Sequence, residues 1–170
     1  MRWADFEVAA PELASFGRQR IERFGFVFLG TIRKDGGPRI NPVEAHFVQG
    51  ELAHALMKGS VKALDLLRDA RAYLHTPVLD WERGTPGEFK LRARAVPVGD
   101  EGLRDAIADA IERRGGYRPP DDWHFFTIDA ESAAFHDYDE AAGLHRFERW
   151  TPERGYEAMT RTITSSPGAE

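Results

Sequence analysis

Residues 25–57 hold three runs of β-forming residues that are separated by short turn sequences. The first run, GFVFLGTI, is rich in Val, Phe and Ile, which favour strands. The sequence DGG at residues 35–37 supplies the backbone freedom of a tight hairpin, and QG at 49–50 separates RINPVEAHFV from ELAHALM. Because strands joined by such short turns lie antiparallel, this region predicts a three-stranded meander.

Strand and helix patterns continue along the rest of the chain. Runs typical of strands recur at residues 71–79, 88–98, 124–129, 132–139 and 144–150. Apolar residues at helical spacing predict helices at 11–24, 60–69 and 102–114. In the second of these helices, Val61, Leu64 and either Leu66 or Leu67 are expected to face the core. Strands outnumber helices and short turns join neighbours, which favours an antiparallel barrel with helices on its rim over a parallel α/β sheet.

Composition limits the classes of protein that fit. The 170 residues suffice for one domain with a hydrophobic core, which we expect over residues 1–158, followed by a disordered tail over 159–170. A net charge of −5 argues against nucleic-acid binding. No run approaches the roughly 20 apolar residues that cross a bilayer. The N-terminus also lacks an apolar signal-peptide core, so we expect a cytoplasmic protein without membrane contact.

Side chains that carry out chemistry by themselves are scarce. The lack of cysteine excludes disulfides, thiolate metal sites and cysteine nucleophiles. The six histidines follow no common metal-binding spacing, so we expect no metal site, although His75 or His145 could ligate a haem. The sequence has no P-loop, dinucleotide fingerprint, HExxH or GxSxG motif. We therefore assign no catalytic residue.

The segment MKGSVKALDLL, at residues 57–67, combines features of an anion site. Ser60 is a suitable N-cap for a short helix. The free backbone N–H groups at a helix start favour an anion, and Lys58 and Lys62 add positive charge. A capped helix with two solvated lysines is an ordinary interpretation of the same residues.

The segment PRINPV, at residues 38–43, is a second candidate. Arg39 could form a bidentate contact with a phosphate, and Asn41 could hydrogen-bond a polar ring edge. Pro42 cannot donate to a β-ladder, so it predicts an edge strand or a bulge that leaves neighbouring backbone groups free for a ligand. An edge strand with an exposed arginine explains the same residues without a ligand.

In their order and spacing, these segments resemble the pyridoxamine-5′-phosphate-oxidase-like FMN-binding family. The shared features are a strand, a glycine turn, a strand with Pro-Val, a further strand, then G-S-x-K-A and an L-x-R-D helix, most closely over residues 28–74. The resemblance implies an α+β fold, a six-stranded antiparallel split β-barrel with peripheral helices. It also implies a homodimer whose FMN site lies at the subunit interface and is completed by residues of the second subunit.

The resemblance implies cofactor contacts from two strands and from the start of the short helix. These residues are Arg39, Ile40, Asn41, Pro42, Ala55, Leu56, Met57, Lys58, Ser60 and Lys62. Arg39 and Lys62 would hold the phosphate, with help from Ser60. The strand residues would border the isoalloxazine ring through backbone or side-chain contacts.

The implied activity is flavin hydride transfer with a small-molecule substrate, and FMN is the expected cofactor. Val61 stands where the vitamin B6 oxidase itself carries a basic residue, and Glu44 stands near a second such position, which argues against that enzyme's own substrate. The related deazaflavin-dependent oxidoreductases match at least as well, which makes F420 the alternative cofactor. A barrel that binds flavin or haem without turnover is the non-enzymatic alternative.

Overall fold

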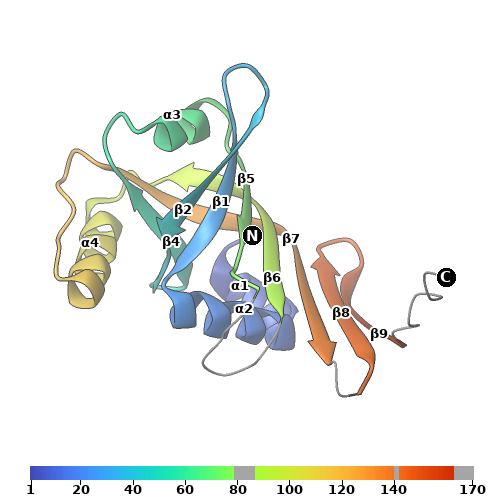
Figure 1. The fold of residues 1–170 in the computed structure, drawn as a ribbon. Helices are drawn as coiled ribbons and strands as arrows, with labels where there is room; N and C mark the ends of the chain where they lie inside the picture. The colour runs from blue at the N-terminus through green and yellow to red at the C-terminus, as the bar shows by residue number, and fades with distance from the viewer. Residues whose placement is uncertain (79–86, 140–141, 163–170) are drawn as a thin grey trace.

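A curled antiparallel sheet with helices packed against it organises the chain (Figure 1). The computed structural model describes residues 1–78, 87–139 and 142–162. The helices are α1 (Trp3–Ala9), α2 (Pro11–Phe24), α3 (Val61–Arg68) and α4 (Glu101–Gly115). The strands are β1 (Phe26–Ile32), β2 (Pro38–Glu44), β3 (His46–Val48), β4 (Glu51–Leu56), β5 (Arg71–His75), β6 (Glu88–Pro97), β7 (His124–Asp139), β8 (Leu144–Thr151) and β9 (Gly155–Thr162). None of these described helices is long and apolar enough to span a membrane.

Hydrogen bonds join the strands in the order β2-β1-β5-β6-β7-β4-β3, and β8 and β9 extend the sheet from β7. Every one of these strand pairs is antiparallel. The resemblance implied six barrel strands, and the strand runs predicted along the chain cover β1 to β8, whereas β9 was not expected. In the described part of the chain β2 pairs only with β1, so the barrel is split at this edge. The predicted antiparallel α+β fold and the edge position of Pro42 are confirmed.

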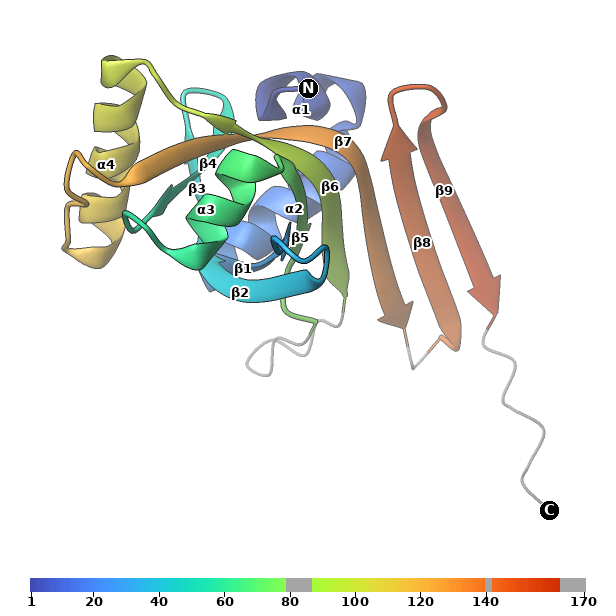
Figure 2. The ribbon, with the colours of Figure 1, turned by 90° about the horizontal axis from the view of Figure 1, so that it is seen from above.

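A β-bulge accounts for one difference from the expected strands. Two strands were expected over 124–129 and 132–139, but β7 is continuous. Its register against β6 shifts between Arg92 and Ala93, because Glu131 is an extra residue on β7. The bulge lets one long strand bend while it stays paired, and Figure 2 shows β7 bending toward the β8–β9 hairpin.

Three further elements correct the expectation. The strand expected over 39–48 is broken at Ala45 into β2 and β3. Strand β9 extends to Thr162, so residues 159–162 are paired with β8 rather than part of a disordered tail. The rest of that expected tail, residues 163–170, lies outside the described residues. Helix α1 was not expected either, and its formation depends on burial rather than on a long apolar repeat.

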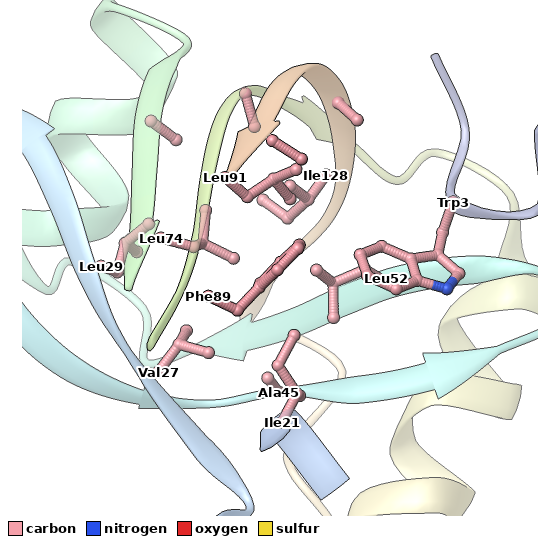
Figure 3. Packing of buried hydrophobic residues seen from close by; sticks show 14 of the residues in the cluster. Trp3, Ile21, Val27, Leu29, Ala45, Leu52, Leu74, Phe89, Leu91 and Ile128 are labelled. Carbon is pink, nitrogen blue, oxygen red and sulfur yellow. The ribbon is translucent and has the colours of Figure 1, made fainter. Parts of the chain in front are cut away.

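Most large buried side chains meet between the sheet and helices α1 and α2 (Figure 3). Trp3 and Phe6 of α1 contact Phe89 of β6 there. A second apolar cluster lies between the sheet and α4. Strand β4 is buried on both faces, because Leu52 belongs to the first cluster and Ala53 to the second.

Gly17 lets helix α2 pack closely on the core. A Cβ atom at this position would lie 2.7 Å from Cζ of Phe89, whose ring is buried. Alanine in place of a helix glycine ordinarily stabilises by about 0.5–1 kcal/mol, but overpacking a core costs about 1–3 kcal/mol. We expect Gly17→Ala to lower the free energy of unfolding in urea by about 1–2 kcal/mol. Gly102→Ala, at the exposed start of α4, is the control and should not lower it. An unchanged Gly17→Ala stability would mean that the Phe89 ring moves aside freely.

Candidate cofactor-binding site

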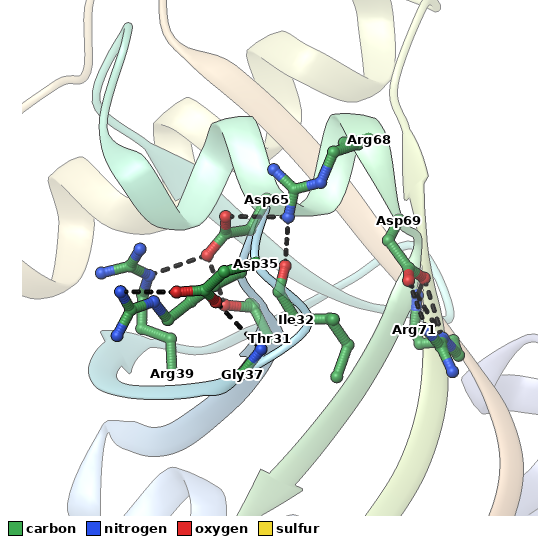
Figure 4. A network of polar contacts seen from close by, with 10 residues as sticks. Thr31, Ile32, Asp35, Gly37, Arg39, Asp65, Arg68, Asp69 and Arg71 are labelled. Carbon is green, nitrogen blue, oxygen red and sulfur yellow. Dashed lines mark hydrogen bonds and ion pairs between the residues drawn. The ribbon is translucent and has the colours of Figure 1, made fainter.

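Hydrogen bonds to the buried carboxylate of Asp65 join helix α3 to the β1–β2 hairpin (Figure 4). The Asp65 side chain is 5% exposed. Its Oδ2 accepts hydrogen bonds from Nε of Arg39 at 2.7 Å and from Oγ1 of Thr31 at 3.0 Å. Its Oδ1 accepts one from Nη2 of Arg68 at 3.0 Å, and Arg68 also donates to the carbonyl of Ile32. These bonds hold the inner face of α3 against the strand that carries Arg39.

The surface around this carboxylate is positively charged. Burial alone would raise the pKa of Asp65, but the hydrogen bonds from Arg39, Arg68 and Thr31 together hold this pKa below its usual value. Asp65 is therefore ionised at neutral pH. A groove of about 440 Å³ along α3 and the hairpin is lined by more cations than carboxylates, namely Arg33, Lys34, Arg39 and Arg68 against Asp35 and Asp65. The excess of positive charge favours an anionic ligand.

The start of α3 offers an unsatisfied hydroxyl group. Ser60 occupies the predicted N-cap position, and its carbonyl accepts a hydrogen bond from the N–H of Leu64 at 3.0 Å. The Ser60 hydroxyl does not cap the helix. Its Oγ is buried and has no hydrogen-bond partner among the described residues. Lys62, which is half-buried, likewise makes no ion pair with any residue that the structure describes. Lys58 differs, since its Nζ lies 3.3 Å from Oδ2 of Asp122.

Arg39 and Lys62 approach the same side of α3. Lys62 and Asp65 are three residues apart, and residues at this spacing are neighbours on one face of a helix. Arg39 reaches that face from β2 through its bond to Asp65. Ser60 stands at the N-terminal end of the same helix. Arg39 lines the charged groove, whereas Ser60 and Lys62 lie at the start of the same helix and are not among the residues that line that groove.

Helix α3 is rotated relative to the sequence-based expectation. Val61 and Leu64 were expected to face the core, but both are exposed, as is Met57 before the helix. Leu66, one of the two leucines considered for an inward position, is buried, and the other inward positions are taken by Asp65 and an alanine. This rotation is what lets Asp65 meet the arginine of the hairpin, and it leaves an apolar stripe on the outer face of α3.

An apolar hollow of about 530 Å³ adjoins the charged groove, on the outer face of β1, β2 and β5. Gly30 forms its centre, because it pairs with Ile40 on one side and with Tyr73 on the other and has no side chain of its own. Phe28 adds an aromatic ring to the lining. Arg39 is the residue that lines both the hollow and the groove.

The residues that were predicted to border a flavin ring are only partly gathered at this hollow. On β2, Ile40 lines the hollow and is 68% exposed, Pro42 is exposed and Asn41 is half-buried. On β4, Ala55 packs against the cluster next to α4 and Leu56 belongs to the main core. The side chains of Ala55 and Leu56 therefore do not line this hollow.

Sequence analysis did not single out Phe28, Gly30 or Tyr73, which line the hollow. One signal was available in the run GFVFLGTI, whose residues are apolar on both faces of the strand. A strand with one face in water usually alternates apolar and polar residues. The lack of alternation is therefore a sequence signal that the outer face of β1 is apolar.

Ionisable groups lie at one end of the hollow, where His75 is part of the lining. Nε2 of His75 lies 3.1 Å from Oε2 of Glu88, and Lys90 also pairs with Glu88. Burial would raise the pKa of Glu88, but Lys90 and His75 hold it below its usual value. Nδ1 of His75 lies 2.6 Å from the carbonyl oxygen of Thr76. Both ring nitrogens of His75 are thus engaged, whereas at His145 it is Nδ1 that lies 3.1 Å from Nε2 of a neighbouring histidine.

Comparison with known proteins identifies the fold. No protein-family model and no curated protein sequence matches the chain. A pyridoxamine 5′-phosphate oxidase-related, FMN-binding protein from Nostoc punctiforme is similar in structure, with a TM-score of 0.59 and 11% identity over 87% of this chain and 94% of that one. PhzG from Burkholderia lata 383, solved with tetrahydrophenazine-1-carboxylic acid, has a TM-score of 0.60 and 13% identity over 94% of this chain and 93% of that one.

Haem proteins share the same architecture. HutZ, the haem storage protein from Vibrio cholerae, is similar with a TM-score of 0.56 and 17% identity over 72% of this chain and 90% of that one. At these identities the likeness concerns the fold. The chain has the split-barrel fold of the pyridoxamine 5′-phosphate oxidase-related proteins, as its sequence predicted.

Proposed function

We propose that this split-barrel protein binds FMN at the junction of α3 and the β1–β2 hairpin and works as a flavin-dependent oxidoreductase on a small-molecule substrate. The observation that carries the proposal is the buried, unpartnered Oγ of Ser60 at the start of α3. A buried polar atom without a partner is costly, and a ligand oxygen at this point would satisfy it. Lys62 and Arg39 supply the positive charge that a phosphate requires.

The donor set fits a phosphate group in chemistry as well as in charge. Backbone N–H groups at the start of α3 have no partner within the helix, and they would donate to an anion at this position. The Ser60 hydroxyl, the Lys62 ammonium and the Arg39 guanidinium add side-chain donors. When it is bound, FMN supplies the redox chemistry by accepting or donating a hydride, and the chain binds and orients it.

The apolar hollow fits the ring part of such a cofactor. Its volume of about 530 Å³ lies in the range of about 300–1,000 Å³ typical of ligand sites. Its floor is made of Gly30 with Ile40 and Tyr73 at the sides, which suits a flat aromatic ring system. Arg39 borders both spaces, and we propose that one ligand places its phosphate beside Arg39 and its ring in the hollow.

We further propose that a second copy of the chain covers the hollow and completes the site. Phe28, Ile40 and Tyr73 expose large apolar surfaces on the outer face of the sheet, and Val61 and Leu64 do so on α3. Exposed apolar surface of this extent is typical of an interaction site. Light scattering coupled to size exclusion should give a dimer mass, whereas a monomer mass would remove this part of the proposal.

Replacing Lys62 tests the phosphate site. We expect Lys62→Ala to weaken FMN binding about tenfold, because a charge-assisted hydrogen bond to the phosphate is lost. Binding of riboflavin, which has no phosphate, should not change. Lys58→Ala removes the same charge from a side chain that Asp122 already holds, so a smaller loss is expected. The assignment is wrong if Lys62→Ala binds FMN as tightly as the parent chain.

The visible spectrum of the purified protein separates FMN from the alternatives. A flavin spectrum supports the proposal, and a deazaflavin spectrum would assign the same phosphate site to F420. A Soret band would instead favour haem, the ligand that HutZ stores. Colourless protein that takes up none of these cofactors when they are added would contradict a cofactor function. Turnover would then be tested with a reductant and a screen of small substrates.

A further inference from the structure

A hydrogen bond fixes one of the three nitrogens of the Arg39 guanidinium group. Nε donates to Oδ2 of Asp65 at 2.7 Å, and no described residue accepts a hydrogen bond from Nη1 or Nη2. A guanidinium group is planar and binds phosphate through two parallel N–H groups. Fixing Nε therefore fixes the direction in which both Nη groups present their protons. The Arg39 side chain is 28% exposed, which leaves part of the group accessible to a ligand.

Asp65 is itself firmly placed. Thr31 from β1 and Arg68 from its own helix donate to the carboxylate at 3.0 Å each, and the side chain is buried. If the carboxylate turned away, these donors and Arg39 would lose their acceptor, and leaving such groups unpaired costs free energy. The support behind Arg39 is therefore rigid before any ligand arrives.

We propose that Asp65 is a positioning residue that holds Arg39 as a two-pronged clamp for the phosphate of the cofactor. This inference rests on the proposed function, because it takes a phosphate as the group that Arg39 binds. The ligand class that the clamp selects is a phosphate monoester, in preference to the same ring system without its phosphate.

If Asp65 acted through its charge alone, it would weaken phosphate binding instead of strengthening it. A carboxylate close to a phosphate repels it, so removing the Asp65 charge would tighten phosphate binding if only Coulomb interactions mattered. Positioning predicts weaker binding, because an Arg39 side chain without its support must lose conformational freedom when it binds. The direction of the change therefore separates the two roles.

The experiment compares FMN with riboflavin, whose fluorescence is quenched on binding, in the parent chain and its variants. We expect the parent to prefer FMN, and Asp65→Asn to bind FMN about tenfold more weakly with riboflavin binding unchanged. Arg39→Lys keeps the charge but lacks the two parallel N–H donors of the guanidinium group, and should show the same loss of FMN binding. The double variant should lose no more than either single variant, because the two residues act as one unit.

Two results would overturn the role of Asp65. One is unchanged or tighter FMN binding by Asp65→Asn. The other is a full preference for FMN in Arg39→Lys, which decides the matter even if Asp65→Asn does not fold. A parent chain that binds FMN and riboflavin equally removes the phosphate site and this inference together. A loss in Lys62→Ala without any loss in Asp65→Asn or Arg39→Lys keeps the site and removes only the clamp.

Discussion

Replacing Trp3 with alanine is expected to lower the free energy of unfolding by about 3–5 kcal/mol. The Trp3 side chain is fully buried. Its ring centroid lies 5.2 Å from that of Phe6 and 4.8 Å from that of Phe47, and Nε1 donates to Oε1 of Glu7 at 2.8 Å. Alanine would leave a large cavity where α1 joins the sheet, because the surrounding rings can relax only in part. Urea unfolding followed by circular dichroism measures the loss.

Two variants in the same part of the chain serve as controls. Trp3→Phe keeps much of the ring volume but loses the hydrogen bond to Glu7, so its cost should be clearly smaller than that of Trp3→Ala. Val8→Ala changes a residue of α1 that is 84% exposed, and should shift stability by no more than about 0.5 kcal/mol. If Trp3→Ala cost no more than Val8→Ala, the indole ring would not anchor α1.

Helix α1 also shows where prediction from sequence stops. The barrel strands could be predicted because turn residues mark their ends, as at Gly36 and Gly50, which both adopt positive φ. Helix α1 has only seven residues, and Trp3 and Phe6 are its buried side chains, which is too short a pattern to establish a helical repeat. Its stability comes from contacts with distant strands, which are not visible in the local sequence.

The candidate site could be predicted as a set of residues but not as an arrangement. Arg39 and Lys62 were identifiable from residue type and position along the chain. Asp65, which holds Arg39, is 26 residues from Arg39 and 34 from Thr31, so these contacts exist only once the hairpin has folded onto α3. Helical periodicity predicted that Val61 faces inward. This prediction was wrong because the spacing of apolar residues does not reveal that a buried carboxylate occupies the inner face.

Acidification is expected to destabilise the fold through His54. The His54 ring is fully buried. Nδ1 lies 2.6 Å from the carbonyl oxygen of Glu44, which makes Nδ1 the donor, and Nε2 has no partner among the described residues. Burial is the main cause that lowers the pKa of His54 to about 4, with nearby His46 acting in the same direction against the hydrogen bond to Glu44. The folded protein therefore keeps this ring neutral at physiological pH.

The unfolded chain takes up a proton at His54 at a higher pH than the folded protein does. An unperturbed histidine has a pKa of about 6.5, so above this pH His54 is neutral in both states and makes no difference. Between about pH 6.5 and the folded pKa of about 4, only the unfolded state is protonated, and unfolding becomes more favourable as the pH falls. The full effect is about 3 kcal/mol, of which about 2 kcal/mol is lost by about pH 5.

Urea unfolding at about pH 7.5 and about pH 5 tests this expectation with a variant that cannot titrate. His54→Asn keeps a side-chain donor near the Glu44 carbonyl, and we expect it to lose about 2 kcal/mol less than the parent chain between these two pH values. His124→Asn changes a partly exposed ring and should retain the full loss. The comparison is between the two pH values within each variant, so a lower stability of His54→Asn at both does not affect it. Equal losses in the parent chain and in His54→Asn would show that other groups cause the acid sensitivity.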